Sequence, residues 1–352
     1  MFGNSLLDLE LFVEDAEFIS YKRAGVGTGR SKTGQRKKWK RRYWFEQDLM
    51  SRELRKLGET KFKNKHGGCS AADVEFIWQK IQEHVIRPRE SFFHARNKLL
   101  MWLDKIHNDL SFEQISTSYH IGVATAVEYI QDLLPGMIEG YRDSNIISFY
   151  TEEQRMRMMQ INKRRGLKMA NALFTMDGKH AKCRGLHIPE RRSPKYDCHI
   201  PCFTALFVIE RTFGTICAYN VDQECTKHDI TVLRESAWYQ NLMELTNGWI
   251  IMADKGYVGP LATNIAAAHK RNSKRRHQWP LLFWKEMSKA RCDSERIFSH
   301  FFVNKFKQLG NWPGKGKKSF KKWALNVTCA IIVYNEVKLR NVQVCDKKFK
   351  SN

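Results

Sequence analysis

The hydrophobic period changes once along this 352-residue chain, and that change limits the fold more than any other feature. Between about residues 71 and 168, apolar residues recur every three or four positions, as in VEFIWQKIQEHVI and HARNKLLMWLDKI. This spacing is typical of amphipathic helices. After Met169 the apolar residues come in short runs rich in β-favouring side chains, namely ALFTMD, FTALFVIE and TICAYNV. The sequence therefore predicts a helical domain followed by a domain built on a sheet.

The order of elements after Met169 indicates an α/β arrangement. The second and third runs are joined through residues 211–214, which favours a hairpin. A helix-like stretch, DITVLRESAWYQNLMEL, precedes a fourth strand, WIIMAD, and a helical pattern then runs from about Leu281 to Leu309. We expect three strands, a helix, a strand and a helix, in that order.

Two of the predicted strands end in an acid, at Asp177 and Asp254. An unpaired carboxylate in apolar surroundings is costly, so a cation shared between adjacent strand tips would stabilise both. If the first and fourth strands lie side by side, the two acids converge. An Asp at the end of a strand is also a common turn former, and that alternative stands for each acid taken alone.

A third carboxylate comes from the last helical pattern. The apolar residues Phe298, Phe302 and Phe306, extended backwards at similar spacing, lead to Glu295 and then Arg291. We therefore expect Glu295 to point with the core face, toward the two aspartates. Oxygen ligands of this kind favour Mg²⁺ or Mn²⁺ over zinc. The alternative is an ordinary ion pair between residues four apart on a helix.

The charge of the chain points to nucleic acid as its partner. Sixty Lys and Arg residues against 37 Asp and Glu leave a formal net charge of +23, which attracts polyanions. Two basic clusters are candidate phosphate contacts, with a solvated linker or loop as the alternative for each. They are Arg36, Lys37, Lys38, Lys40, Arg41 and Arg42, and Lys270, Arg271, Lys274, Arg275 and Arg276. No apolar run approaches the roughly 20 residues of a membrane helix, so we expect no membrane association.

A helix-turn-helix pattern lies within the helical region, at residues 111–134. Ser111 can cap a first helix, residues 120–122 can form a turn, and a second helix can begin at Val123. In a DNA-binding helix-turn-helix the second helix enters the major groove, which makes Thr125 a candidate DNA contact. The second helix has no Lys or Arg before residue 134, and an ordinary helical hairpin is the alternative.

Four motifs in order resemble the DDE superfamily of transposases, in particular the Harbinger/PIF type. They are MDGKHAKC around Asp177, KHDITVLRES around Asp229, ADKGY around Asp254, and Arg291-x-x-x-Glu295 followed by FFVNKFKQL. The resemblance covers roughly residues 70 to 340. One departure from the family pattern is Trp284, where related chains commonly have Asn.

The resemblance implies an RNase H-like catalytic domain, a mixed sheet flanked by helices, in which Asp177, Asp254 and Glu295 bind two Mg²⁺ or Mn²⁺ ions. Such a transposase cuts double-stranded DNA at the ends of a mobile element and joins the 3′-hydroxyl to target DNA. Four further residues are expected near this site: His180, Asp229, Lys255 and Arg291. Lys255 and Arg291 would either meet phosphate or neutralise the acids before metal binds.

This interpretation divides the chain into four parts. Residues 1–65 form an acidic start and a basic arm, 66–168 a helical DNA-binding domain, 169–340 the nuclease domain and 341–352 a basic tail. Because two DNA ends must be held, we expect a homodimer or larger assembly. The resemblance adds a Myb-like DNA-binding partner. The expected location is the nucleus in a eukaryote, or otherwise the cytoplasm, on DNA.

Two other functions compete with the transposase. One is a host protein descended from a transposase that binds DNA or a partner without cutting. The other is a sequence-specific regulator that uses the helix-turn-helix alone and needs no metal.

Overall fold

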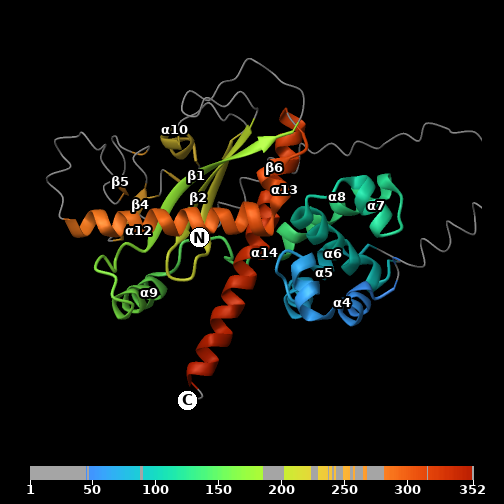
Figure 1. Cartoon of the computed structure of the whole chain (residues 1–352), viewed down its shortest axis with the longest axis horizontal. Helices are drawn as coiled ribbons and strands as arrows, with labels where there is room; N and C mark the ends of the chain where they lie inside the picture. The colour runs from blue at the N-terminus through green and yellow to red at the C-terminus, as the bar shows by residue number, and fades with distance from the viewer. Residues whose placement is uncertain are drawn as a thin grey trace, which may run out of the picture. The chain divides into compact units, whose positions relative to one another are not determined.

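The computed structural model describes residues 45, 47–87, 90–184, 202–222, 229–236, 238–239, 242, 249–253, 257, 265–267, 281–314 and 316–350. The chain divides into two compact units, with the boundary between Ser144 and Asn145. The first unit is helical and the second is built on a sheet (Figure 1). The order of a helical unit followed by a sheet unit agrees with the sequence, although the boundary lies before the change in hydrophobic period at Met169.

The helical unit is held by well-capped helices around a buried aromatic core. Ser70 caps one helix through a reciprocal capping box with Asp73. Trp78 and Trp102 are fully buried. Two of the helices pack so closely that a Cβ atom added to Gly136 would lie 2.6 Å from Val85 Cγ2. The helices are α4 (Leu49–Lys65), α5 (Ala71–Val85), α6 (Phe92–Asn108), α7 (Phe112–Ser118) and α8 (Val123–Gly140).

Helices α7 and α8 and the turn between them occur where the sequence predicts two helices and a turn. Ser111 accepts from the backbone N–H of Gln114, and the Gln114 side chain accepts in return from the backbone N–H of Ser111. His120 in the turn has a φ of 53°, in the left-handed region. On α8, Ile130 is buried and Val127 is half-buried.

The second unit contains a mixed sheet in the order β3-β2-β1-β4-β5, with β6 paired to β1. Strands β1, β2 and β3 are antiparallel neighbours, whereas β4 runs parallel to β1, and β5 parallel to β4. The strands are β1 (Phe174–Cys183), β2 (Cys202–Glu210), β3 (Ile216–Asp222), β4 (Ile251–Ala253), β5 (Ile265–Ala267) and β6 (Asn311–Trp312). The fold is therefore mixed α/β, which agrees with the predicted α/β class.

Helices pack on both faces of the sheet, which explains why strand β1 begins with consecutive buried residues. One face packs Phe174 and Met176 with Val232 and Leu233 of α10, and with Met158 of α9. The other face packs against α12, which Figure 1 shows running alongside the sheet. The helical elements are α9 (Glu152–Arg164), α10 (Asp229–Arg234), α12 (Leu281–Phe298), the π-helix η3 (Ser299–Lys305), α13 (Lys307–Gly310) and α14 (Lys317–Lys350).

The structure draws the part boundaries differently from the sequence-based division. Helix α4 begins at Leu49, inside the expected arm, and Phe62 on it is fully buried. Helix α9 falls within the predicted helical domain, but its Met158 packs in the core of the sheet unit. The expected tail from residue 341 continues helix α14 to Lys350. Helical periodicity identifies a helix without indicating which core its apolar face joins.

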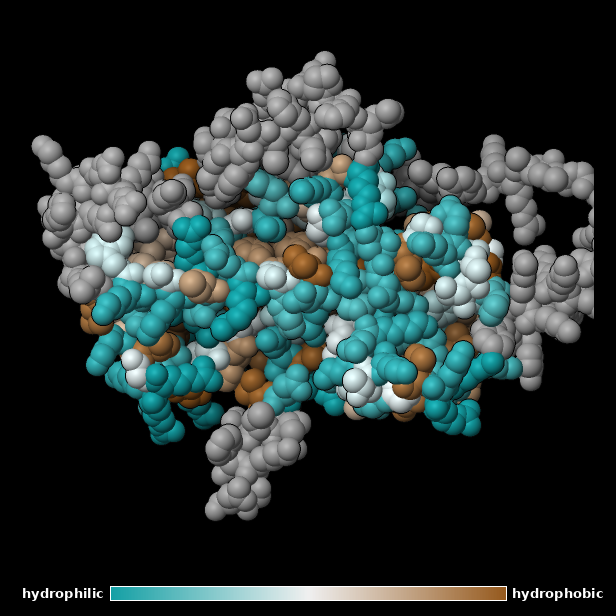
Figure 2. All heavy atoms as spheres, viewed as in Figure 1, coloured by the Kyte–Doolittle hydropathy of each residue, from teal (hydrophilic) through white to brown (hydrophobic). Residues whose placement is uncertain are grey.

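Among the residues that the structure describes, no helix combines the length and the apolar composition needed to cross a membrane. Hydrophilic side chains dominate the face shown in Figure 2, and the hydrophobic ones appear as separate spots. The exposed large hydrophobic residues are correspondingly dispersed, from Ile86 to Val303. Scattered exposed apolar residues of this kind are normal for a protein surface.

Candidate functional site

Strands β1 and β4 are neighbours, and each contains or leads into one of the two acids predicted at strand ends. The two strands are parallel neighbours, and their last register pair joins Met176 to Ala253. Asp177 follows Met176 directly, and Asp254 follows Ala253 directly. The first and fourth predicted strands therefore lie side by side, which is the condition on which convergence of the two acids depends. Asp254 and Lys255 themselves lie outside the described residues.

Asp177 lies on the face of the sheet that α12 covers. Successive strand residues alternate between faces, so Asp177 shares a face with Thr175. The Thr175 hydroxyl is 3.4 Å from the backbone carbonyl oxygen of Ala290 on α12, to which it donates a hydrogen bond. Asp177 is half-buried, and its Oδ1 accepts from the backbone N–H of Gly178 at 2.9 Å. A half-buried acid at this position remains accessible to a ligand.

The buried stripe of α12 differs from the predicted one. It runs backwards from Phe298 through Ser294 and Ala290 in steps of four residues. The prediction used a step of three from Phe298 to Glu295. The Glu295 side chain is instead 57% exposed, so the expectation that it points with the core face is wrong. Steps of three and of four residues lead to different sides of a helix. The apolar stripe alone did not show which step to use.

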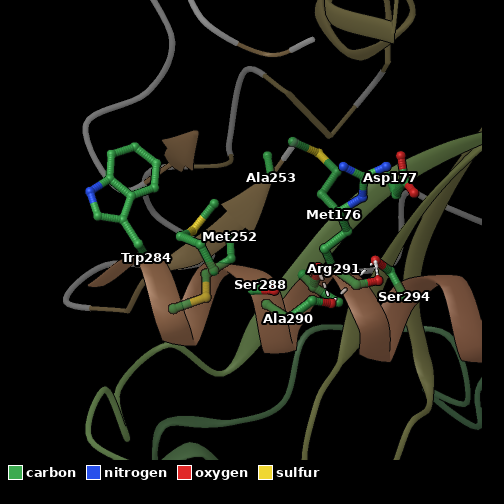
Figure 3. A pocket seen from close by; sticks show the side chains of 11 residues that line it. Met176, Asp177, Met252, Ala253, Trp284, Ser288, Ala290, Arg291 and Ser294 are labelled. Atoms are coloured by element: carbon green, nitrogen blue, oxygen red, sulfur yellow. Dashed lines mark hydrogen bonds between the residues drawn. The ribbon is translucent and has the colours of Figure 1, made fainter. Parts of the chain in front are cut away.

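The Arg291 side chain pairs with Glu295 and points toward Asp177 (Figure 3). Its Nε donates to Glu295 Oε1 at 2.9 Å, so the ordinary ion pair between residues four apart is present. Figure 3 shows the Arg291 side chain pointing toward Asp177. The Arg291 side chain is 60% exposed, and an ion pair as exposed as this one contributes at most about 1 kcal/mol. The pair is therefore weak enough to be exchanged for another partner.

A pocket of about 220 Å³ lies between β1, β4 and α12. In Figure 3, Trp284 stands at one end of it, Arg291 and Asp177 stand at the other, and Met252 lies between. The pocket therefore has an aromatic end and a charged end. Its described lining consists of Thr175, Met176, Asp177, Met252, Ala253, Trp284, Met287, Ser288, Ala290, Arg291 and Ser294.

Helix α12 is attached to the sheet unit by a buried cation that the sequence analysis did not identify. Arg211, in the turn between β2 and β3, has a side chain that is 1% exposed. It donates to the backbone carbonyl of Ala172 at 2.9 Å. Its guanidinium also lies 3.9 Å from Glu286 Oε2 and 3.6 Å from Asp293 Oδ2. The acids and the arginine are more than 70 positions apart in the sequence, and no local pattern links them.

The remaining candidates described by the structure lie elsewhere. His180 is three residues beyond Asp177, so strand alternation directs it to the opposite face of β1. Its Nδ1 is 2.9 Å from Thr204 Oγ1, and it is not among the described residues that line the pocket. Asp229 begins α10, which packs on that opposite face through Val232. The expectation that His180 shares the site of Asp177 is therefore wrong.

The DNA-binding candidates are either in the helical unit or outside the described residues. Thr125 is half-buried on α8 of the helical unit. The basic clusters at residues 36–42 and 270–276 lie outside the described residues, so the structure does not bear on them. Within the described ranges, no three His, Cys, Asp or Glu residues form a group that could hold a metal ion. One of the three predicted metal ligands, Asp254, is outside those ranges.

Comparisons of the chain with protein-family profiles, with curated proteins and with solved structures gave no match. The resemblance to DDE transposases therefore rests on the sequence motifs alone, and the function has to be argued from the chemistry and geometry of the site.

Proposed function

We propose that this protein is a metal-dependent DNA endonuclease and strand transferase of the DDE transposase kind, with an RNase H-like catalytic domain. The observation that supports the proposal most is the parallel register of β1 and β4, in which the residues bonded to Asp177 and Asp254 are partners. Neighbouring strands lie roughly 4.8 Å apart, and consecutive Cα atoms are about 3.8 Å apart. Two acids attached to one register pair are thus well suited to share cations that are about 4 Å apart.

The donor set fits hard divalent cations. Asp177 is half-buried and Glu295 exposed, so both carboxylates are accessible, and Arg291, which lines the pocket, pairs with Glu295 and points toward Asp177 (Figure 3). Asp177, Asp254 and Glu295 would hold two Mg²⁺ or Mn²⁺ ions through oxygen ligands. When bound, such ions activate a water or a 3′-hydroxyl and stabilise the leaving oxygen of a phosphodiester displacement.

Arg291 is proposed to have two partners. Its guanidinium pairs with Glu295 in the structure. If a cation were held by that carboxylate, Arg291 could contact a DNA phosphate instead, for which its planar donors are well matched. The residue would then compensate the acids in the free protein and contact substrate in the complex.

DNA is the proposed substrate because of charge. The net charge of +23 supports binding to a polyanion, and the basic clusters at residues 36–42 and 270–276 are proposed to contact phosphates. Helices α7 and α8 are proposed to act as a DNA-binding helix-turn-helix, with Thr125 at the DNA. Assembly into at least a dimer, a Myb-like partner and a location on nuclear DNA belong to the same proposal.

One observation favours a second candidate, a transposase-derived protein that binds DNA and does not cut it. The protein's own cation, Arg291, neutralises Glu295 and points toward Asp177. A chain that had lost its metal ions would need such a compensating charge permanently. The two candidates differ in whether the acids are required for any reaction.

A nicking assay separates them. The substrate is DNA carrying candidate inverted repeats, incubated with Mg²⁺ or Mn²⁺. Asp177→Asn and Asp254→Asn should abolish cleavage and leave DNA binding largely intact. Asp222→Asn, which alters an acid at the end of β3, is the matched control and should cut normally. If the wild type and Asp177→Asn behave alike, the enzyme proposal fails.

A further inference from the structure

We infer that the pocket between β1, β4 and α12 receives one unpaired nucleobase of the DNA strand that is being processed. The inference rests on the proposed function, because it assumes that DNA occupies this site. It adds that the strand is bound with a base unstacked and inserted beside the acids. Enzymes that modify a base take it out of the stack into a pocket, at a cost of a few kcal/mol for unstacking, and a similar insertion here would position the strand.

The lining of the pocket suits the flat face of an aromatic ring. Its apolar members include one indole, from Trp284, and the thioethers of Met252 and Met287. Bases stack on aromatic side chains without regard to sequence, and thioether sulfurs also make favourable contacts with rings. Sugar and phosphate, which are hydrated and polar, would gain nothing from these groups.

Several polar groups in the pocket are already directed at the protein itself. Thr175 donates to the carbonyl oxygen of Ala290, and Ser294 lies 3.0 Å from the carbonyl oxygen of Arg291, within hydrogen-bonding distance. The hydroxyls therefore do not make the interior strongly polar. A phosphate or sugar would need several donors there, whereas a base needs mainly surface to stack on.

The size agrees with a base. An apolar cavity of about 150 Å³ in another protein is large enough to bind benzene. The pocket here is about 220 Å³, so it admits a ring system larger than benzene but not a base pair. A paired base would also have to bring its partner strand, for which this volume leaves no room.

The polarity along the pocket matches that of a nucleotide. Trp284 and Arg291 are seven residues apart on α12, which corresponds to about 10 Å along a helix. Figure 3 shows the aromatic ring and the guanidinium at opposite ends. A nucleotide likewise carries an apolar base at one end and an anionic phosphate at the other. A base stacked near Trp284 would therefore leave its phosphate near Arg291 and the acids.

Photo-cross-linking tests the inference without requiring cleavage. A single-stranded oligonucleotide of mixed sequence carries one 5-iododeoxyuridine, a base that cross-links to aromatic side chains on which it stacks. The full-length protein is irradiated with this probe in metal-free buffer, and the cross-linked residue is identified by mass spectrometry. The same probe annealed to its complement is the paired control.

The pocket is then blocked by substitution. Ser288→Leu fills it from an exposed position of α12 that lines the pocket. Ser299→Leu is the matched control, because it introduces the same side chain at an exposed position of η3 outside the described lining. Fluorescence anisotropy measures total DNA affinity for each variant.

We expect cross-linking at Trp284 by the single-stranded probe, at least about fivefold above the paired probe. Ser288→Leu should reduce it by about fivefold or more, the equivalent of the roughly 1 kcal/mol minimum for stacking one base, and Ser299→Leu should not. Absence of a Trp284 cross-link, equal cross-linking of paired DNA, or insensitivity to Ser288→Leu would each overturn the inference. Cleavage that depends on Asp177 without a Trp284 cross-link leaves the proposed function standing. A cross-link that depends on the pocket, without cleavage in any metal, would support base binding and overturn the proposed cleavage.

Discussion

Replacement of Arg211 by methionine tests whether a buried cation fixes α12, the helix that carries Trp284, Arg291 and Glu295. The Arg211 and Glu286 side chains are 1% and 2% exposed, so both charges are removed from water. Methionine retains much of the side-chain volume but leaves Glu286 buried and facing only Lys289 among the cations that lie near it in the described residues, at 3.4 Å. Removing one partner of a buried ion pair costs about 3–5 kcal/mol.

We expect Arg211→Met to lower the free energy of opening by about 3–5 kcal/mol. A second variant tests whether the uncompensated charge of Glu286 causes that loss. In the double variant Arg211→Met, Glu286→Gln, the uncompensated charge is gone, and at least half of the lost stability should return. Hydrogen exchange of peptides from α12 and β4, followed by mass spectrometry, measures the free energy of opening for this part of the chain. A loss below about 1 kcal/mol in Arg211→Met, or no recovery in the double variant, would refute the reasoning.

Three further predictions concern other parts of the chain. Burial raises the pKa of Glu210 to about 7 although Thr212 and Phe213 donate backbone N–H groups to it. The free energy of unfolding should therefore fall by roughly 2.5 kcal/mol between pH 4.5, where the native state is protonated and the unfolded state about half protonated, and pH 7. Denaturant titrations should show that fall in the wild type and a flatter profile in Glu210→Gln; identical profiles would contradict it. Gly136→Ala should destabilise the helical unit by about 1–3 kcal/mol, because the new methyl group meets Val85 and the His84 carbonyl. Gly122→Ala makes only ordinary contact at 3.5 Å and should cost less than about 1 kcal/mol, from the poorer N-cap of α8. Arg291→Leu should change the free energy of unfolding by less than about 1 kcal/mol, since the pair with Glu295 is exposed, and a larger loss in urea titration would mean that the guanidinium has a buried structural role.

The sequence predicted strands β1 to β3, a helix, strand β4 and helix α12 in their order, but not β5 or β6. That order rests on local signals, namely short apolar runs and helical periodicity, whereas the pairing of β1 with β4 was only a condition for the two acids to converge. The same kind of signal located helix α7, because Ser111 forms the expected cap.

The orientation of Glu295 and the role of Arg211 could not be predicted in the same way. Whether a helical residue faces the core depends on choosing a step of three or four residues, and Ser294, a polar residue, occupies the buried position next to Glu295. Arg211 meets Glu286 and Asp293 only after α12 packs against the hairpin turn. Such contacts depend on tertiary packing between segments far apart in the sequence.

His180 shows a different failure. The motif around Asp177 places it three residues away, which the resemblance interprets as proximity to the site. On an extended strand an odd separation directs two side chains to opposite faces, and His180 contacts Thr204 of β2 instead. Strand alternation, applied to the motif itself, would have given the correct expectation.

The central claim is that Asp177, Asp254 and Glu295 together bind two divalent cations. Titration of the full-length protein with Mn²⁺, monitored by the loss of the free-ion electron paramagnetic resonance signal, measures the number of ions bound. We predict two ions for the wild type and for Asp222→Asn, and at least one fewer for each of Asp177→Asn, Asp254→Asn and Glu295→Gln. An unchanged number of bound ions in Asp177→Asn and Asp254→Asn would contradict the claim.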